Sequence, residues 1–293
     1  MEIILQSDQI SNSAKTPAQA STDDEVIRLW LYGRPGNTQR AYLREVQRWR
    51  SFTQKPFRVV TLGDVQEFAE SLSDLKSSSV ARALAAIKSL MSFAHEIGYV
   101  PFNVGTALRL PTVRNRRSER ILTEEQVMRM LALTRNPRDH ALLRLAYASA
   151  LRISEMASLS WSDLAQRGDA GQVSVVAKGG KTHTILLSAG TWSEMIALRH
   201  SESTDDLPVF VSRKGNRLSK AQIHRVVVAA AHRAGINSKV SLHWMRHAHA
   251  SHALDRGAPI HLVSQTLNHS NLATTSVYVH ARPTESSGKY LGV

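Results

Sequence analysis

Two β-rich runs interrupt a chain whose apolar residues otherwise recur at the 3.6-residue spacing of helices. The runs lie within residues 172–187, on either side of Gly179 and Gly180, and this pattern is typical of a hairpin. Residues 208–211 are a candidate for a third, short strand. We therefore expect a mainly α fold with a small antiparallel β-sheet, of the α+β class.

The helical part of the chain divides into two predicted domains. Residues 1–20 are polar and without periodicity, which predicts a flexible tail. Residues 21–110 predict a helical N-terminal domain, with helices over 37–52, from Thr61 and over 77–97. Residues 111–120 hold one proline and four arginines and predict an exposed basic linker. Thr123 and Gln126 then form a capping-box pattern, which begins a second domain over residues 121–293.

The charge balance favours a polyanionic partner. Lys and Arg number 37 against 24 Asp and Glu, a net charge of +13, which points to nucleic acid ahead of membrane. A soluble basic protein without such a partner remains the plainer alternative. The absence of cysteine excludes disulfides, cysteine nucleophiles and thiolate metal sites, and fits a cytoplasmic protein. The apolar run at residues 3–5 is too short for a signal sequence or a membrane span, so we expect a soluble intracellular protein.

One face of the first long helix is basic. Arg40, Arg44 and Arg48 recur at i, i+4 and i+8, and no acidic residue stands at i±4 on that stripe. The stripe suits a phosphate backbone, although an ordinary solvated face gives the same pattern. The linker arginines expected to contact the same partner are Arg114, Arg116 and Arg117.

The last fifty residues concentrate side chains that can hold and attack a phosphate. Arg246 offers a planar fork for two phosphate oxygens, and His243 lies three residues earlier, on the same helical face. His269 can donate a hydrogen bond to the same group. Tyr278 can act as a covalent nucleophile, but a phenol ionises near pH 10 and needs a cationic site or a base.

Four histidines within ten residues also suggest zinc. They are His243, His247, His249 and His252. The metalloprotease motif needs a glutamate after its first histidine, and Trp244 stands there instead. We therefore disfavour a metal site and expect the last three of these histidines to have structural roles.

Two upstream elements supply further charge. Arg152 follows an apolar helix, and Glu155 at i+3 can orient it, although a plain surface ion pair would look the same. Lys178 and Lys181 flank the predicted hairpin turn. A hairpin lysine is usually solvated, but here Lys178 could protonate a leaving oxygen as general acid.

Taken together, these residues resemble the tyrosine recombinase (phage integrase) family, and within it the Xer-like bacterial members. The matches are the first arginine box at residues 151–161, the hairpin lysine at Lys178, the His-x-x-Arg box at residues 243–246, the Leu-x-His box at residues 267–269 and the nucleophile at Tyr278. The spacing from Arg246 to Tyr278, 278 − 246 = 32 residues, is similar to that of the family. Ala150 stands where glycine is common, and Ala248 and His249 replace the more usual Thr-Phe.

The resemblance implies a site-specific DNA recombinase. Residues 21–107 would form a SAM-like core-binding domain, and the rest a catalytic domain that exchanges strands through a 3′-phosphotyrosyl intermediate and a Holliday junction. It implies a homotetramer on two duplexes, with a second recombinase as a further candidate partner, and no metal, ATP or other cofactor. Its outcome would be DNA integration, excision or dimer resolution, in the cytoplasm at the nucleoid. The residues it assigns to catalysis are Arg152, Lys178, His243, Arg246, His269 and Tyr278, with Glu155 in support.

Three other functions compete with this interpretation. A non-catalytic DNA-binding protein could keep the fold, but would have no need of the arginines, lysine and tyrosine together. A type IB-like topoisomerase uses the same tyrosine chemistry on one duplex. A zinc-dependent hydrolase is the most distant alternative.

Overall fold

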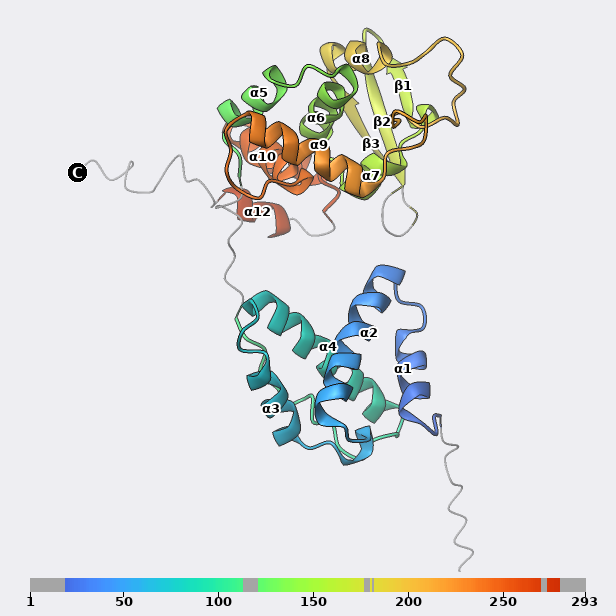
Figure 1. Ribbon diagram of the computed structural model, residues 1–293, viewed down its shortest axis with the longest axis vertical. Coiled ribbons are helices and arrows are strands. Elements are labelled where there is room, and N and C mark those ends of the chain that lie inside the picture. The colour runs from blue at the N-terminus through green and yellow to red at the C-terminus, as the bar shows by residue number, and fades with distance from the viewer. Residues whose placement is uncertain (1–18, 113–120, 177–179, 181, 270–272, 280–293) are drawn as a thin grey trace, which may run out of the picture. The chain divides into compact units, whose positions relative to one another are not determined.

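The computed structural model describes residues 19–112, 121–176, 180, 182–269 and 273–279 (Figure 1). The chain separates into two compact units, Met1–Arg114 and Asn115–Val293, and each is considered by itself. Both are mainly helical, and the second contains a three-stranded antiparallel sheet, which confirms the predicted fold class. No helix in the described ranges has the length and hydrophobicity needed to cross a membrane.

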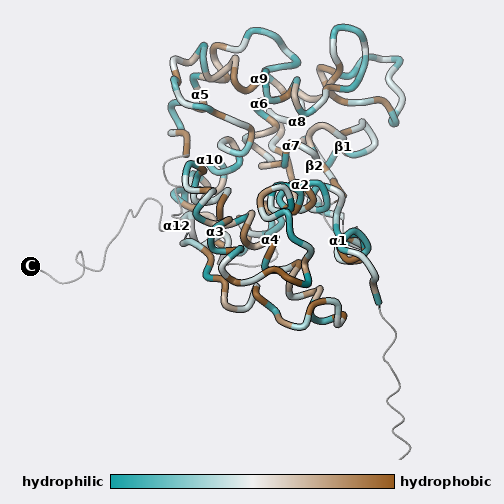
Figure 2. Tube along the Cα trace, turned by 60° about the horizontal axis from the view of Figure 1, so that its bottom comes forward, coloured by the Kyte–Doolittle hydropathy of each residue, from teal (hydrophilic) through white to brown (hydrophobic). Residues whose placement is uncertain are grey.

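The first unit is a helical bundle whose helix ends follow local sequence signals. Thr61 and Asp64 form a reciprocal capping box, as the predicted helix start required. Its core contains stacked rings of Trp49 and Phe57, whose centroids lie 5.4 Å apart. Along these helices, brown apolar and teal polar residues intermix in Figure 2, as amphipathic packing requires. The elements are α1 (Asp23–Leu31), α2 (Gly36–Thr53), the 3-10 helix η1 (Phe57–Val59), α3 (Leu62–Ser71) and α4 (Ser77–Glu96).

The second unit places its helices around α6, with the sheet at one side (Figure 1). The capping box predicted at Thr123 and Gln126 is present and begins α5. The helices are α5 (Glu124–Ala132), α6 (Pro137–Ser149), α7 (Ile153–Ser158), η3 (Trp161–Asp163), α8 (Ala189–Ile196), α9 (Lys220–Arg233), α10 (Leu242–Asp255), α11 (Ile260–Thr266) and α12 (Ala273–Val279). Helix α10 packs against both α6 and α12, so it connects the core to the C-terminal helices.

The sheet has the order β1 (Leu164–Arg167), β2 (Ala170–Val176) and β3 (Thr182–Leu187). The predicted hairpin is confirmed as the antiparallel pair β2–β3, with Val173 opposite Ile185 and both side chains in the core. Gly171 allows the ring of Trp192 in α8 to lie directly on β2, since a Cβ there would come within 2.1 Å of the ring.

The third strand predicted at residues 208–211 is wrong. This segment makes only isolated bridges, Ser160 with Pro208 and Val211 with Arg217. Proline has no N–H to continue a ladder, and Val211 turns back on Arg217 through Gly215, whose φ is +74°. The third strand is β1 instead.

Candidate active site

The candidate site begins where α6 ends. Ala150, the C-cap of this helix, adopts a left-handed conformation with φ 51°, which turns the chain so that Arg152 becomes the N-cap of α7. The Arg152 backbone N–H donates to Glu155 Oε2 at 2.7 Å, and Arg152 Nη1 donates to Glu155 Oε1 at 2.9 Å. The same carboxylate therefore caps the helix and orients the half-exposed guanidinium.

The left-handed conformation of Ala150 is one that glycine adopts more readily than alanine. A Cβ in this conformation costs roughly 1–2 kcal/mol, which glycine avoids. The Ala150 methyl group is fully buried and packs in the cluster that contains Tyr278. Burial of the methyl group therefore offsets part of the backbone cost.

Arg246 on α10 is buried, with 4% of the residue exposed. Its Nη1 donates to the Ala150 carbonyl at 2.5 Å, and its Nη2 donates to the Leu267 carbonyl. Arg152 Nη2 donates to the neighbouring Asn268 carbonyl at 3.3 Å. The two guanidinium groups thus meet at the same backbone segment, although they come from α10 and α7.

The surroundings of Arg246 lower the pKa of its guanidinium group. Burial, and secondly the positive charge of Arg152, lower the pKa of Arg246 to about 10, while Glu155 opposes the shift. The side chain therefore stays charged at neutral pH in a position that disfavours charge. An anion bound between the arginines would relieve both effects.

His269 follows α11 and connects it to α12. Its Nδ1 lies 2.9 Å from Thr275 Oγ1, and its backbone N–H donates to the Ser264 carbonyl at 3.1 Å. The preceding residue, Asn268, is left-handed with φ 45°, which reverses the chain after α11. His269 is thereby placed next to the backbone segment that both arginines contact.

Tyr278 on α12 is almost fully buried, at 3% exposure, in a cluster with Ala150, Ala250, Val263 and Leu267. Its hydroxyl lies 2.6 Å from Nδ1 of His247. His247 is equally buried, and the exposed ring of His243 packs edge-on against it with centroids 4.1 Å apart. These contacts place the candidate nucleophile against α10, at the residue that follows Arg246 in the chain.

His247 was expected to have a structural role, and the structure places it directly against the candidate nucleophile. The available sequence signal was its spacing, since residue 247 is four positions from His243 and shares its helical face. His249 and His252 lie on the other side of α10, with their Nδ1 atoms 2.7 Å from the Tyr147 carbonyl and 2.8 Å from the Tyr147 hydroxyl. Burial lowers the pKa of His249, which favours the neutral ring.

The four histidines of α10 consequently do not converge on one point. His247 faces Tyr278 and has His243 packed against its ring, whereas His249 and His252 face Tyr147. Among the residues described, no three His, Cys, Asp or Glu side chains are grouped so that they could hold a metal ion.

Two of the three arginines in the basic stripe on α2 contact a buried carboxylate. Arg48 Nη1 lies 3.0 Å and Arg44 Nη2 3.6 Å from the carboxylate of Glu45, which Arg82 of α4 also contacts at 3.1 Å. Arg40 donates to Asn37 at 2.6 Å. No acidic residue stands at i±4 on the stripe, as the sequence shows, but Glu45 at i+1 from Arg44 and i−3 from Arg48 turns fully inward and pairs with both arginines.

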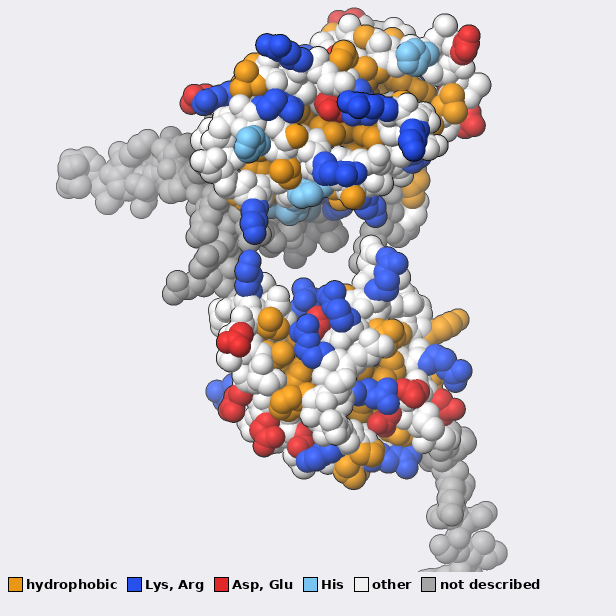
Figure 3. All heavy atoms as spheres, viewed as in Figure 1, with side chains coloured by type: hydrophobic (Ala, Val, Ile, Leu, Met, Phe, Trp, Pro, Cys, Tyr) orange, Lys and Arg blue, Asp and Glu red, His pale blue; other side chains and the backbone are white. Residues whose placement is uncertain are grey.

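Several predicted residues lie outside the described ranges, namely Lys178, Lys181, Arg114, Arg116 and Arg117. On the face seen in Figure 3, Lys and Arg side chains gather at the upper end of the first unit.

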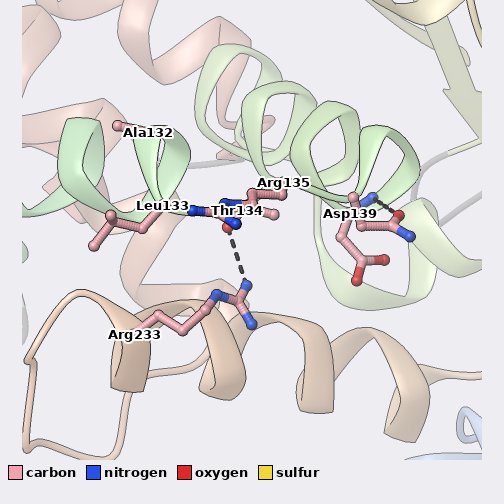
Figure 4. Close-up of a pocket in the computed structure, with 7 residues that line it drawn as sticks. Ala132, Leu133, Thr134, Arg135, Asp139 and Arg233 are labelled. Carbon is pink, nitrogen blue, oxygen red and sulfur yellow. Dashed lines mark hydrogen bonds between the residues drawn. The ribbon is translucent and has the colours of Figure 1, made fainter.

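A separate pocket of about 600 Å³ lies between α9 and the turn from α5 to α6 (Figure 4). There Arg233 donates to Thr134 Oγ1 at 3.1 Å, and no candidate catalytic residue lines it.

Comparisons with known proteins match both units. The phage integrase family matches residues 120–285, and the N-terminal SAM-like domain of phage integrases matches residues 33–97. The chain is similar to the tyrosine recombinase XerD of Vibrio cholerae, with 31% identity over 92% of this chain and 94% of that protein. It is similar also to XerC of Haemophilus influenzae, with 30% identity over 81% and 80%.

Solved structures agree on the fold. A lambda integrase dimer bound to a COC′ core site superposes with a TM-score of 0.74 at 17% identity, over 90% of this chain and 77% of that one. The XerH recombinase bound to its palindromic difH substrate, in a post-cleavage complex, gives 0.72 at 16% identity, over 93% and 85%.

Proposed function

The chain belongs to the phage integrase family, and we propose that it is a site-specific tyrosine recombinase that cleaves DNA, exchanges strands and rejoins them. The observation that carries the assignment to particular residues is the convergence of Arg152 and Arg246 on the carbonyls of Asn268 and Leu267, directly before His269. Tyr278 lies in the same buried cluster as Leu267. A phosphate there would meet two guanidinium groups and a phenol.

In this proposal the arginines and histidines hold the scissile phosphate. Arg152 and Arg246 bind its non-bridging oxygens and stabilise the charge that develops in the pentavalent transition state. His243 and His269 donate further hydrogen bonds, and Glu155 positions Arg152. Arg246 has donors beyond the two N–H groups that bond Ala150 and Leu267, because a guanidinium carries five.

The tyrosine supplies the covalent step. The Tyr278 oxygen attacks phosphorus, the bond from phosphorus to the 5′-oxygen breaks, and a 3′-phosphotyrosyl link forms. Lys178, assigned from the hairpin lysine of the family, protonates the departing 5′-oxygen. A 5′-hydroxyl of the partner duplex then attacks the link and releases tyrosine. The covalent intermediate conserves the phosphodiester bond energy, so that these steps need neither ATP nor a metal ion.

The remaining parts of the chain are assigned to DNA binding and assembly. We assign core-site binding to residues 21–110, through Arg40, Arg44 and Arg48, and phosphate contacts to the linker at residues 111–120. Solved relatives include a lambda integrase tetramer bound to a Holliday junction, and we propose four protomers of this chain on two duplexes. The setting would be the cytoplasm, at the nucleoid.

The test is covalent trapping on a nicked suicide substrate, on which the cleaved 5′ fragment diffuses away. The site would first be isolated by selecting bound sequences. Tyr278→Phe should bind this DNA normally and form no adduct. Tyr147→Phe, which changes a half-buried tyrosine that also lies against a histidine, should form the adduct. An adduct with Tyr278→Phe rejects this tyrosine as nucleophile. Relaxation of supercoiled DNA without exchange between two sites would favour a topoisomerase instead.

A further inference from the structure

His247 has a contact that phosphate binding does not explain. Its Nδ1 lies 2.6 Å from the Tyr278 hydroxyl, and both residues are 3% exposed. Two buried polar groups at this distance are joined by a hydrogen bond, and of the two only the imidazole can act as a base at neutral pH. We propose that His247 is the general base that accepts the proton of Tyr278 during cleavage. This proposal rests on the proposed function, since it presumes Tyr278 as nucleophile.

The position of His247 suits this role better than those of the other two histidines near the site. Nδ1 of His269 lies at the Thr275 hydroxyl, so that nitrogen is directed to Thr275 rather than to the phenol oxygen of Tyr278. His243 is exposed and packs edge-on against the His247 ring. His247 stands between His243 and Tyr278, because its own ring also contacts the phenol ring, with centroids 5.4 Å apart.

The chemical step balances without a further reactant. In the neutral tautomer with its proton on Nε2, His247 accepts the hydrogen bond of the tyrosine at Nδ1. As the bond from the Tyr278 oxygen to phosphorus forms, the phenol proton moves to Nδ1, and the bond to the 5′-oxygen breaks as that oxygen takes a proton from the general acid. In rejoining, the imidazolium returns its proton to the departing phenolate.

Two variants separate proton transfer from positioning. In His247→Asn the side-chain amide can place an acceptor near the position of Nδ1, but an amide does not take a proton at neutral pH. His247→Ala removes the acceptor altogether. If proton transfer is the role, both variants should form the covalent adduct about 100-fold more slowly than wild type or worse, the range expected for loss of a general base. His261→Ala, an exposed histidine of α11, is the matched control.

The site of proton transfer is tested with a second suicide substrate, in which sulfur replaces the bridging 5′-oxygen. A thiolate leaves without protonation, so this substrate should rescue Lys178→Ala. It should leave His247→Asn as slow as before, because the nucleophile still has to lose its proton.

Two results would overturn the proposal. One is a rate of adduct formation by His247→Asn that lies within about 3-fold of the wild-type rate, because loss of a general base should slow the step far more. The other is restoration of that variant by the sulfur substrate, which would move His247 to the leaving group. Thermal melting and DNA binding establish that the variants fold. Failure of the proposed function gives a different result, because the wild type would then form no adduct or Tyr278→Phe would still form one.

Discussion

The contact between His247 and Tyr278 predicts an energetic coupling that can be measured without DNA. Tyr278→Phe removes the hydroxyl, and His247→Leu removes the acceptor at similar volume. Leaving a buried polar group without its partner costs about 1–3 kcal/mol, whereas removing both partners costs less than the sum. The double-mutant cycle should therefore give a coupling of about 1–2 kcal/mol, within the range for residues in contact.

The measurement is native-state hydrogen exchange of the peptide that contains α12 (Ala273–Val279), because undocking of this helix breaks the contact. Each single variant should lower the free energy of opening by about 1–3 kcal/mol. The control is Tyr147→Phe, which breaks a similar pair with His252 on the other side of α10 and should leave α12 unchanged. A coupling below about 0.5 kcal/mol, the scatter of independent sites, would refute the contact and remove the geometric basis for a base at residue 247.

Four further predictions follow from other contacts. Arg246→Lys should slow adduct formation by about 100-fold or more because the fork is lost; a rate near wild type would remove Arg246 from the site. Adduct formation should be unaffected by a chelator, and inhibition would contradict the metal-free mechanism. A hydrogen bond from Lys55, and secondly one from the Thr61 backbone, lower the pKa of Asp64 from 3.8 to about 2, so this carboxylate stabilises the first unit above about pH 4 and ceases to do so as the pH falls through 2. Asp64→Asn should therefore lose up to about 2 kcal/mol at pH 7 and little at pH 2 by denaturant unfolding; equal losses would contradict this. Arg40→Gln should reduce the salt dependence of log affinity for DNA by about 0.9, and Arg48→Gln by less because Glu45 already pairs it; equal slopes would contradict that.

Local signals in the sequence predicted much of the fold. Capping boxes at Thr61 and Thr123 involve side chains three residues apart, so they can be read without knowledge of the tertiary structure. The β2–β3 hairpin is local as well, and its alternating valines are evident in the chain. Strand β1 lacks such a signal, since only Leu164 of its four residues is buried and the other three are exposed. Its identity depends on pairing with β2.

The surroundings of Glu45 could not be predicted for a different reason. On a helix wheel it belongs with the polar residues, and burying a carboxylate is unfavourable unless it is paired. One of its partners, Arg82, comes from α4, which is distant in sequence. The arginine stripe therefore looked unpaired, because part of its neutralisation depends on the packing of two helices.

Helix α10 presents the same difficulty in the candidate site. It is buried on most sides, so apolar spacing does not distinguish the face toward Tyr278 from the face toward Tyr147. Motif spacing predicted Arg246 and Tyr278, but the division of the four histidines into two pairs depends on where α6 and α12 pack. His247 could be separated from His249 and His252 only once those helices were placed.

The burial of Arg246 is best explained by binding of an anion rather than by stability. The fall of its pKa from 12.5 to about 10 corresponds to roughly 3 kcal/mol against folding at neutral pH. Hydrogen bonds from a charged donor contribute about 1.5–3 kcal/mol each, and those to Ala150 and Leu267 offset this cost without a large surplus. A neutral side chain would avoid the repulsion from Arg152 altogether. The two cations are therefore held at one backbone segment with little net gain in the free energy of folding. A bound anion would stabilise this arrangement, and the scissile phosphate is the anion that the proposed reaction brings to Tyr278.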